Sequence, residues 1–301
     1  MSKPKAIRAH IGAHKTATTH FQDTLAHLAP TLKNENIIYL EREHYRPIIR
    51  KLARGKRLKQ HRLQFFKNRT LIKDLMKDCD NDSVLLLSEE NILGDCIHLC
   101  DIQPFAFIDF TFLNTLLKVA PTELFLSIRS FDSVLSGAYC TALKYHPREA
   151  LIAKEKLQNA FNEDIYPSWI PLIERLKNSL PNASLSVWTQ EHYKNASSDV
   201  IRHFIERPKQ HVPVIERPRE TVTPSEAAIV NIEQLIVDEK NVVESGSKWE
   251  SKCDDIYRKY SAETDEQKFS FFTPVQKKVV QQRYRQELDE IDIRWPGIIV
   301  R

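Results

Sequence analysis

Five short apolar runs alternate with longer segments of helical periodicity, and this alternation limits the fold more than any other feature of the chain. Residues 83–87 form a short, continuous apolar run, and such runs fit strands that are buried on both faces of a parallel sheet. Strands that alternate with helices imply right-handed crossovers between parallel neighbours. We therefore predict an α/β fold, in which a three-layer parallel β-sheet is flanked by helices. The predicted strands span residues 5–11, 36–40, 83–87, 123–128 and 183–188.

Apolar residues spaced three and four positions apart predict the helices that connect these strands. Pro30 is expected to close the first helix, because proline cannot donate to the helical ladder. The predicted helices span residues 18–28, 63–79, 107–119, 132–145, 148–161, 168–180 and 197–205.

The pattern changes beyond residue 211, where prolines punctuate a connection and no clear strand follows. Residues 225–243 and 274–291 have helical periodicity instead. We predict one domain over residues 1–301, with an α/β core over about residues 1–210 and a helical extension over about residues 211–301.

The composition indicates a folded protein with a mild positive charge. A chain of 301 residues, 42% of them hydrophobic, can bury one large core. The net charge of +4 is too small to indicate nucleic-acid binding, but it is compatible with an anionic small ligand. The N-terminal segment has no long apolar run, and residues 105–120 are too polar to span a bilayer. We therefore expect neither a secretory signal nor stable membrane insertion.

Five cysteines are scattered along the chain, and their odd number argues against a disulfide framework. Cys96 and Cys100 flank His98 closely enough to suggest a metal site. This motif lacks the second spaced pair that tetrahedral zinc sites use, so we expect no bound metal. A reduced, cytoplasmic protein is the simplest interpretation.

Residues 11–19 read Ile-Gly-Ala-His-Lys-Thr-Ala-Thr-Thr and follow the first predicted strand. Gly12 allows the backbone to turn sharply, so that the following amides can converge at the N-terminus of a helix. The helix dipole favours an anion at that point. Lys15 adds a full positive charge, and three threonines add hydroxyl donors. This combination predicts a phosphate-binding loop that opens a helix.

The loop differs from the Walker A pattern of ATPases and GTPases. The second glycine of that pattern is missing, and Lys15 follows Gly12 too early. Both differences disfavour an ATP-binding loop.

The segment resembles instead the 5′-phosphosulfate-binding loop of sulfotransferases that use PAPS (3′-phosphoadenosine-5′-phosphosulfate). That family shows a strand, then Gly-x-x-Lys-Thr/Ser-Gly-Thr/Ser-Thr/Ser, then a helix. Ala17 stands here where the family commonly has glycine. By this resemblance, the residues that bind PAPS in the loop are Gly12, Ala13, His14, Lys15, Thr16, Ala17, Thr18 and Thr19.

A second segment resembles the 3′-phosphate-binding element of the same family, which places an arginine at a strand end and a serine about two helical turns later. Arg129 follows the fourth predicted strand, and Ser136 follows it one residue earlier than in many members; Ser133 is the alternative serine. A third segment, residues 187–191, resembles the family's strand that leads to a glutamate. The matches cover roughly residues 5–195 and look most like bacterial and carbohydrate-type enzymes.

The resemblance implies a P-loop-like sulfotransferase fold and in-line transfer of a sulfuryl group from PAPS to a hydroxyl or amine, with a carbohydrate as the favoured acceptor and no metal required. Lys15 would stabilise the charge that builds on the bridging oxygen. Arg129 and Ser136 would hold the 3′-phosphate. Glu89 is the first candidate for a general base and Glu90 the second, although acids at this position also cap helices.

Two other functions stay open on the sequence. A P-loop-type kinase or NTPase would use Lys15 and Thr16 as a degenerate Walker A loop, with Glu89 and Glu90 as the acidic partner. A non-catalytic member of the fold would bind a nucleotide or a glycan without turnover.

Three histidines and a basic run complete the candidates. We expect His10, His14 and His20 to be solvated or hydrogen-bonded rather than metal ligands, with His14 the one that can contact the sulfonate or the acceptor. Residues 50–62 contain seven arginines and lysines without an intervening acid. Such a run is usually a solvated surface, and the alternative is a site for an anionic glycan acceptor.

Overall fold

The computed structural model describes residues 3–43, 45–47, 72–207, 212–216, 223–238 and 246–301. Within them, five parallel strands form one sheet in the order β2-β3-β1-β4-β5, with β1 at its centre. The strands lie where the apolar runs predicted them, so the α/β prediction is confirmed. Their bounds are β1 (Ala6–His10), β2 (Ile37–Tyr39), β3 (Val84–Ser88), β4 (Thr122–Ile128) and β5 (Ser184–Thr189).

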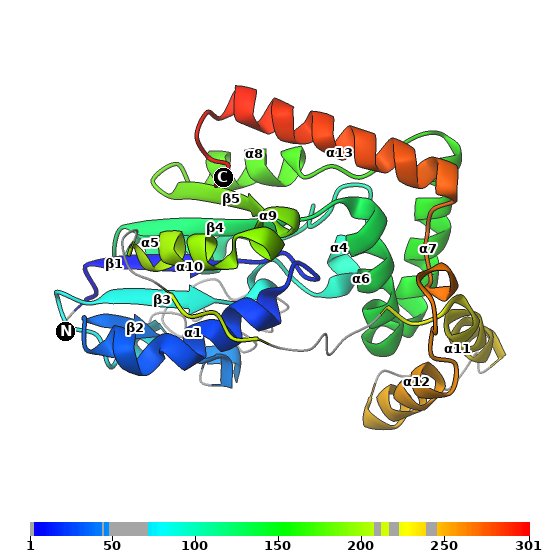
Figure 1. The fold of residues 1–301 in the computed structure, drawn as a ribbon, viewed down its shortest axis with the longest axis horizontal. Helices are drawn as coiled ribbons and strands as arrows, with labels where there is room; N and C mark the ends of the chain where they lie inside the picture. The colour runs from blue at the N-terminus through cyan, green and yellow to red at the C-terminus, as the bar shows by residue number, and fades with distance from the viewer. Residues whose placement is uncertain (1–2, 44, 48–71, 208–211, 217–222, 239–245) are drawn as a thin grey trace, which may run out of the picture.

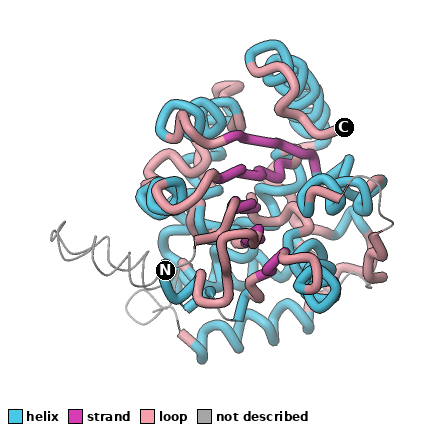
Figure 2. Tube along the Cα trace, turned by 90° about the vertical axis from the view of Figure 1, so that its left-hand side faces the viewer, coloured by secondary structure: helices cyan, strands magenta, loops and turns pink. Residues whose placement is uncertain are grey.

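Helices flank the sheet on both sides (Figure 2). Most of them coincide with the predicted helical segments, and two short helices, α4 and α9, follow strand ends or loops that carried no helical pattern. In the α/β part they are α1 (Thr18–Lys33), α4 (Cys96–Leu99), α5 (Thr111–Leu117), α6 (Phe131–Tyr145), α7 (Pro147–Asn162), α8 (Ile170–Ser179), α9 (Gln190–Asn195) and α10 (Ser197–Ile205).

Side chains alternate between the two faces of the sheet, and each face packs against its own set of helices. On one face, Leu86, Phe125 and Trp188 form a core with α1, α9 and α10. On the other face, Leu87 and Leu126 belong to a larger core with α5, α6 and α8. The result is the three-layer arrangement that the alternation predicted.

Helix α1 is longer than the sequence predicted. Pro30 lies inside the helix instead of closing it, and α1 continues to Lys33. Pro30 is exposed in the last turns, while Leu28 and Leu32 are buried on either side of it. Burial of these leucines therefore holds the helix together beyond the one hydrogen bond that the proline removes.

Two further helix predictions differ from the structure. The segment 107–119 is helical only from Thr111, because Asp109 accepts hydrogen bonds from the backbone and the hydroxyl of Thr111 and so forms a turn before the helix. Residues 63–71 of the predicted helix 63–79 lie outside the described residues, and of the rest only residues 72–75 are helical. The basic run 50–62 lies wholly outside the described residues.

The C-terminal third packs on the α/β part (Figure 1). The sequence predicted α11 (Glu226–Asp238) and α13 (Pro274–Arg294) but not α12 (Ser247–Lys259). Trp249 of α12 donates from Nε1 to the Leu143 carbonyl oxygen of α6 at 3.0 Å. After α13, the chain returns to β5, where Val187 donates to the Ile298 carbonyl oxygen at 2.7 Å.

Candidate functional site

The four segments that follow β1, β3, β4 and β5 meet at the carboxyl edge of the sheet, which is where ligands bind in open parallel sheets. The loop after β1 lies against Glu90, because a Cβ added at Gly12 would stand 2.9 Å from the Cα and Cβ atoms of Glu90. The same loop contacts the end of β4, where Arg129 donates from a guanidinium nitrogen to the Lys15 carbonyl oxygen at 3.2 Å. The predicted site segments are therefore brought together.

Gly12 opens the loop with a φ of +95°, a conformation that favours glycine. Backbone hydrogen bonds attach the loop to β4: Ala13 donates to the Ser127 carbonyl oxygen at 2.7 Å, and Ser127 donates to the Gly12 carbonyl oxygen at 2.5 Å. The glycine thus sets both the turn after β1 and the close approach to Glu90.

Lys15 and Ala17 lie on either side of Thr16 in the left-handed region, with φ values of +64° and +66°. Alternation of left-handed and right-handed residues points successive N–H groups into one concavity that suits an anion. Ala17 is also the N-cap of α1, and its side chain cannot cap the helix. The first N–H groups of α1 have no intrahelical acceptor and remain open to a ligand.

This loop conformation is strained. A non-glycine residue in the left-handed region costs about 1–2 kcal/mol, and Lys15 and Ala17 both adopt it. Strain of this kind persists only where surrounding contacts impose it, and it gathers at binding sites.

The threonines of the loop lie in different environments. Thr16 is buried, and its hydroxyl donates to the Ala13 carbonyl oxygen at 2.6 Å. Thr18 is buried at the start of α1, and Thr19 is exposed. Because the Thr16 hydroxyl is turned beneath the loop, the backbone N–H is the group through which Thr16 could bind a phosphate.

The Lys15 side chain lies along α6. Its aliphatic carbons lie 3.6–3.8 Å from the position that a Cβ at Gly137 would occupy, so the lysine stem passes next to this glycine. Ser133 precedes Gly137 by four residues, which places both on one face of α6. Lys15 therefore reaches from the loop toward the N-terminal half of α6.

Ser136 and Ser133 differ in their surroundings. Ser136 is buried; its hydroxyl accepts from the Phe271 backbone N–H at 3.3 Å and donates to the Asp132 carbonyl oxygen at 3.4 Å. Ser133 instead lines a cavity. The role predicted for Ser136 stays a prediction, and Ser133 is the serine that a ligand in the cavity would meet.

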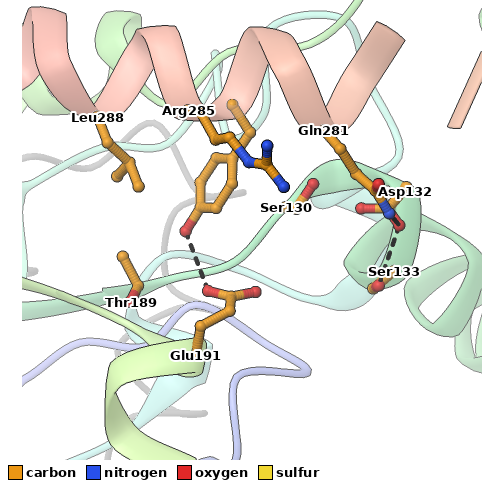
Figure 3. A pocket seen from close by; sticks show the side chains of 9 residues that line it. Ser130, Asp132, Ser133, Thr189, Glu191, Gln281, Arg285 and Leu288 are labelled. Carbon is orange, nitrogen blue, oxygen red and sulfur yellow. Dashed lines mark hydrogen bonds between the residues drawn. The ribbon is translucent and has the colours of Figure 1, made fainter. Parts of the chain in front are cut away.

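A cavity of about 380 Å³ lies between α13 and the ends of β4 and β5 (Figure 3). Arg285 and Gln281 extend from α13 toward the first turn of α6. The cavity is lined by Ser130, Asp132, Ser133, Thr189, Glu191, Gln281, Tyr284, Arg285 and Leu288.

Two buried polar atoms of this wall have no hydrogen-bond partner within the described residues: the hydroxyl oxygen of Ser130 and Oδ1 of Asp132. Ser130 is the N-cap of α6, yet its side chain makes no capping bond. Unpaired buried polar groups are rare and costly, so these two atoms suit a polar ligand. Other carboxylate oxygens of the cavity accept hydrogen bonds: Gln281 donates to Oδ2 of Asp132 at 2.9 Å, and Tyr284 donates to Glu191 at 3.3 Å.

The residues that α13 contributes carry no signal in the sequence. Gln281, Tyr284 and Arg285 belong to a charged helical stretch without a motif. Arg285 lies more than 150 residues from Asp132 in the sequence. Only the packing of α13 against α6 brings them to the strand ends.

Glu89 and Glu90 lie beside the loop and share one partner, Arg46. Arg46 donates from Nε to Glu89 at 3.0 Å and from a terminal nitrogen to Glu90 at 2.9 Å. Burial raises the pKa of Glu89, the negative charge of Glu90 raises it further, and Arg46 opposes them. Glu89 also accepts from the Asn91 backbone at 3.0 Å, which is helix-capping chemistry. Glu90 is the more exposed of the two side chains, at 14% against 1%.

The histidines around the loop are hydrogen-bonded, as the sequence predicted. His14 donates from Nε2 to the Gly94 carbonyl oxygen at 2.6 Å. Burial alone would lower the pKa of His14, but Cys96, Glu90 and this hydrogen bond outweigh burial and raise the pKa to about 9. The protonated imidazole is therefore favoured where it faces Cys96 and Glu90. His20 bonds to the Tyr193 hydroxyl at 2.7 Å.

Within the described parts of the chain, no group of three or more His, Cys, Asp or Glu side chains is placed to hold a metal ion. All five cysteines are free and buried. None of the helices in the described ranges is both long and apolar enough to cross a membrane.

No protein-family model and no curated protein sequence matches this chain. Among solved structures, a crystal structure of retinol dehydratase in a complex with retinol and PAP (3′-phosphoadenosine-5′-phosphate) is similar in outline. The match has 12% sequence identity and a TM-score of 0.31, and it covers 99% of this chain and 83% of the other. A likeness at this level carries no conclusion about function, which depends on the site itself.

Proposed function

We propose that the chain is a PAPS-dependent sulfotransferase that binds the 5′-phosphosulfate on residues 12–19 and the 3′-phosphate beside Arg129. The observation that carries the proposal is the hydrogen bond from Arg129 to the Lys15 carbonyl oxygen. This bond joins two elements that are 114 residues apart in the sequence. The residues of each element resemble one half of a PAPS site, and the contact makes the two halves continuous.

Arg129 does not line the cavity itself, but Ser130, which follows it, does, and the donors of the cavity support a phosphate at that point. The unpaired Ser130 hydroxyl and the hydroxyl of Ser133 lie at the N-terminus of α6, where the helix dipole favours an anion. Arg285 adds a second guanidinium from α13. The carboxylates of Asp132 and Glu191 suit the hydroxyl and amino groups of a nucleoside.

The chemistry follows from the charges at the loop. The bond between the sulfuryl group and the bridging oxygen of PAPS breaks, and a bond forms to the acceptor oxygen or nitrogen. Lys15 and the loop amides stabilise the charge that remains on the departing phosphate, as in phosphoryl transfer. The scheme requires no metal.

The acceptor must lose a proton, and we propose Glu89 as the first candidate to take it and Glu90 as the second. The raised pKa of Glu89 makes its carboxylate a stronger base than that of an ordinary glutamate. Glu90 is more accessible and lies directly against Gly12. Arg46 would hold either carboxylate in place.

A carbohydrate is the proposed acceptor, and the family resemblance is what supports it. An anionic glycan would meet the basic run 50–62. The proposed location is the cytoplasm, because the cysteines are free thiols.

Arg129→Ala is expected to weaken the binding of PAP by about 10–100-fold, because hydrogen bonds to charged groups contribute about 1.5–3 kcal/mol. Binding of ADP, which has no 3′-phosphate, should change much less. Calorimetric titration of both nucleotides checks this.

The matched control for that experiment is Arg175→Ala. Arg175 also donates to backbone carbonyl oxygens, those of Phe105 and Ile108, but lies on α8 away from the cavity. The Arg175→Ala substitution should leave the preference for PAP over ADP unchanged. Equal losses for PAP and ADP in Arg129→Ala would remove the 3′-phosphate assignment.

A further inference from the structure

His10 is fully buried beneath the phosphate loop, at the carboxyl end of the central strand β1. Its Nδ1 lies 2.8 Å from the hydroxyl of Ser88 on β3, and its Nε2 lies 3.0 Å from the hydroxyl of Ser127 on β4. The ring stacks on Trp188, with 4.9 Å between ring centroids. The hydrogen bonds of this side chain thus connect β1, β3 and β4, three of the four strands whose ends carry the proposed site.

The hydrogen bonds of His10 continue into the loop. The Ser127 hydroxyl lies 2.6 Å from the hydroxyl of Thr16, which donates to the Ala13 carbonyl oxygen at 2.6 Å. The resulting chain of polar groups runs Ser88, His10, Ser127, Thr16, Ala13. All of its side chains are buried.

Only one arrangement of protons satisfies this chain. Thr16 donates its single hydroxyl proton to the Ala13 carbonyl oxygen, so the Ser127 hydroxyl must donate to the Thr16 oxygen. Ser127 can then only accept from His10, which places the imidazole proton on Nε2. Nδ1 is left as an acceptor, and Ser88 must donate to it. The chain is therefore directional, and it requires a neutral His10.

The surroundings of His10 agree with a neutral ring. Burial lowers the pKa of His10 to about 3. A protonated ring would donate from both nitrogens, and the buried Ser88 hydroxyl would lose its acceptor.

We propose that His10, Ser127 and Thr16 form a relay of hydrogen bonds that holds the phosphate loop in its binding conformation, with His10 as a positioning residue. Thr16 lies between the two left-handed residues, Lys15 and Ala17, so it is the point at which a contact from below can hold both in place. The relay ties that point to β4 and β1. Its role in catalysis rests on the proposed sulfotransferase function, but the directional chain does not.

The proton arrangement is tested first, without any ligand. Nitrogen-15 NMR of the whole protein should show His10 as the neutral Nε2–H tautomer from neutral pH down to about pH 4, since its pKa is about 3. Thr16→Val removes the acceptor of the Ser127 proton. That proton can then turn to Nε2, and a population of the Nδ1–H tautomer should appear. A wild-type Nδ1–H tautomer, or no change in Thr16→Val, overturns the relay.

Binding is tested second, with PAP as the probe. Thr16→Val should weaken PAP binding about tenfold, and Thr16→Ser, which keeps the hydroxyl, should restore it. Thr122→Val is the control, because Thr122 is a buried hydroxyl at the opposite end of β4 that donates to Ala120. Equal PAP affinity in Thr16→Val and Thr16→Ser overturns the positioning role. If the wild-type protein does not bind PAP, the sulfotransferase proposal fails, and the tautomer measurement alone decides on the relay.

Discussion

Lys15→Met is expected to lower the turnover of PAPS by about 10²–10³-fold, because an electrostatic donor aimed at developing charge contributes about 2.7–4 kcal/mol to the transition state. Methionine keeps an unbranched apolar stem in place of the lysine carbons, which lie 3.6–3.8 Å from the position that a Cβ at Gly137 would occupy. The substitution therefore removes the charge with little change in packing. PAP binding should fall less than turnover, because the charge on the bridging oxygen is greatest in the transition state.

Steady-state transfer from PAPS, with PAP affinity measured separately, checks this expectation. Lys33→Met is the control, since Lys33 is exposed at the C-terminal end of α1, the helix that follows the loop. It should leave both quantities unchanged. Turnover near that of the wild type in Lys15→Met would refute the catalytic role of the lysine.

Gly12→Ala should cost about 2–4 kcal/mol of folding stability and abolish nucleotide binding. The backbone at Gly12 has a φ of +95°, where a side chain is strained, and its new Cβ would stand 2.9 Å from the backbone of Glu90. The cost of backbone strain and the cost of the collision with Glu90 therefore add in the loss of folding stability. Relief of the collision requires the loop after β1 to move away from the segment after β3, which would open the anion site.

Gly297→Ala separates the two causes. Gly297 also has a positive φ, of +81°, but a Cβ there would meet nothing within 4 Å. Its loss of stability should be that of backbone strain alone, about 1–2 kcal/mol. Denaturant unfolding of both variants measures the difference. Comparable losses in the two variants would show that the contact with Glu90 is unimportant.

The sheet could be predicted from the sequence because its strands are buried on both faces. Val84–Leu87 of β3 and Leu124–Leu126 of β4 are continuously apolar, and that pattern does not depend on distant partners. Helix α12 was not predicted because the stretch is short and mostly charged, although its apolar residues Trp249, Cys253, Ile256 and Tyr257 have helical spacing. Its position depends on α6, which lies about a hundred residues away in the chain.

The site residues likewise divide into those that the local sequence predicts and those whose position depends on packing. The loop and Arg129 stand directly after strands, so local sequence and parallel topology predict that they meet. Arg285 reaches the cavity only through the packing of α13, and Ser130 becomes notable only because its hydroxyl is left unpaired. His10 looks in the sequence like any histidine in a strand. Ser127 connects His10 to Thr16 by hydrogen bonds. A local sequence pattern does not predict these contacts, because Ser127 lies more than 100 residues from both partners.

Calorimetric titration of the wild-type protein with PAP, ADP and ATP tests the central claim most directly. A PAPS site predicts that PAP binds at least tenfold more tightly than ADP, because Arg129 and its neighbours contact the 3′-phosphate. Magnesium should not be needed. Binding of ATP with magnesium in preference to PAP would contradict the proposal and favour a kinase or NTPase in its place.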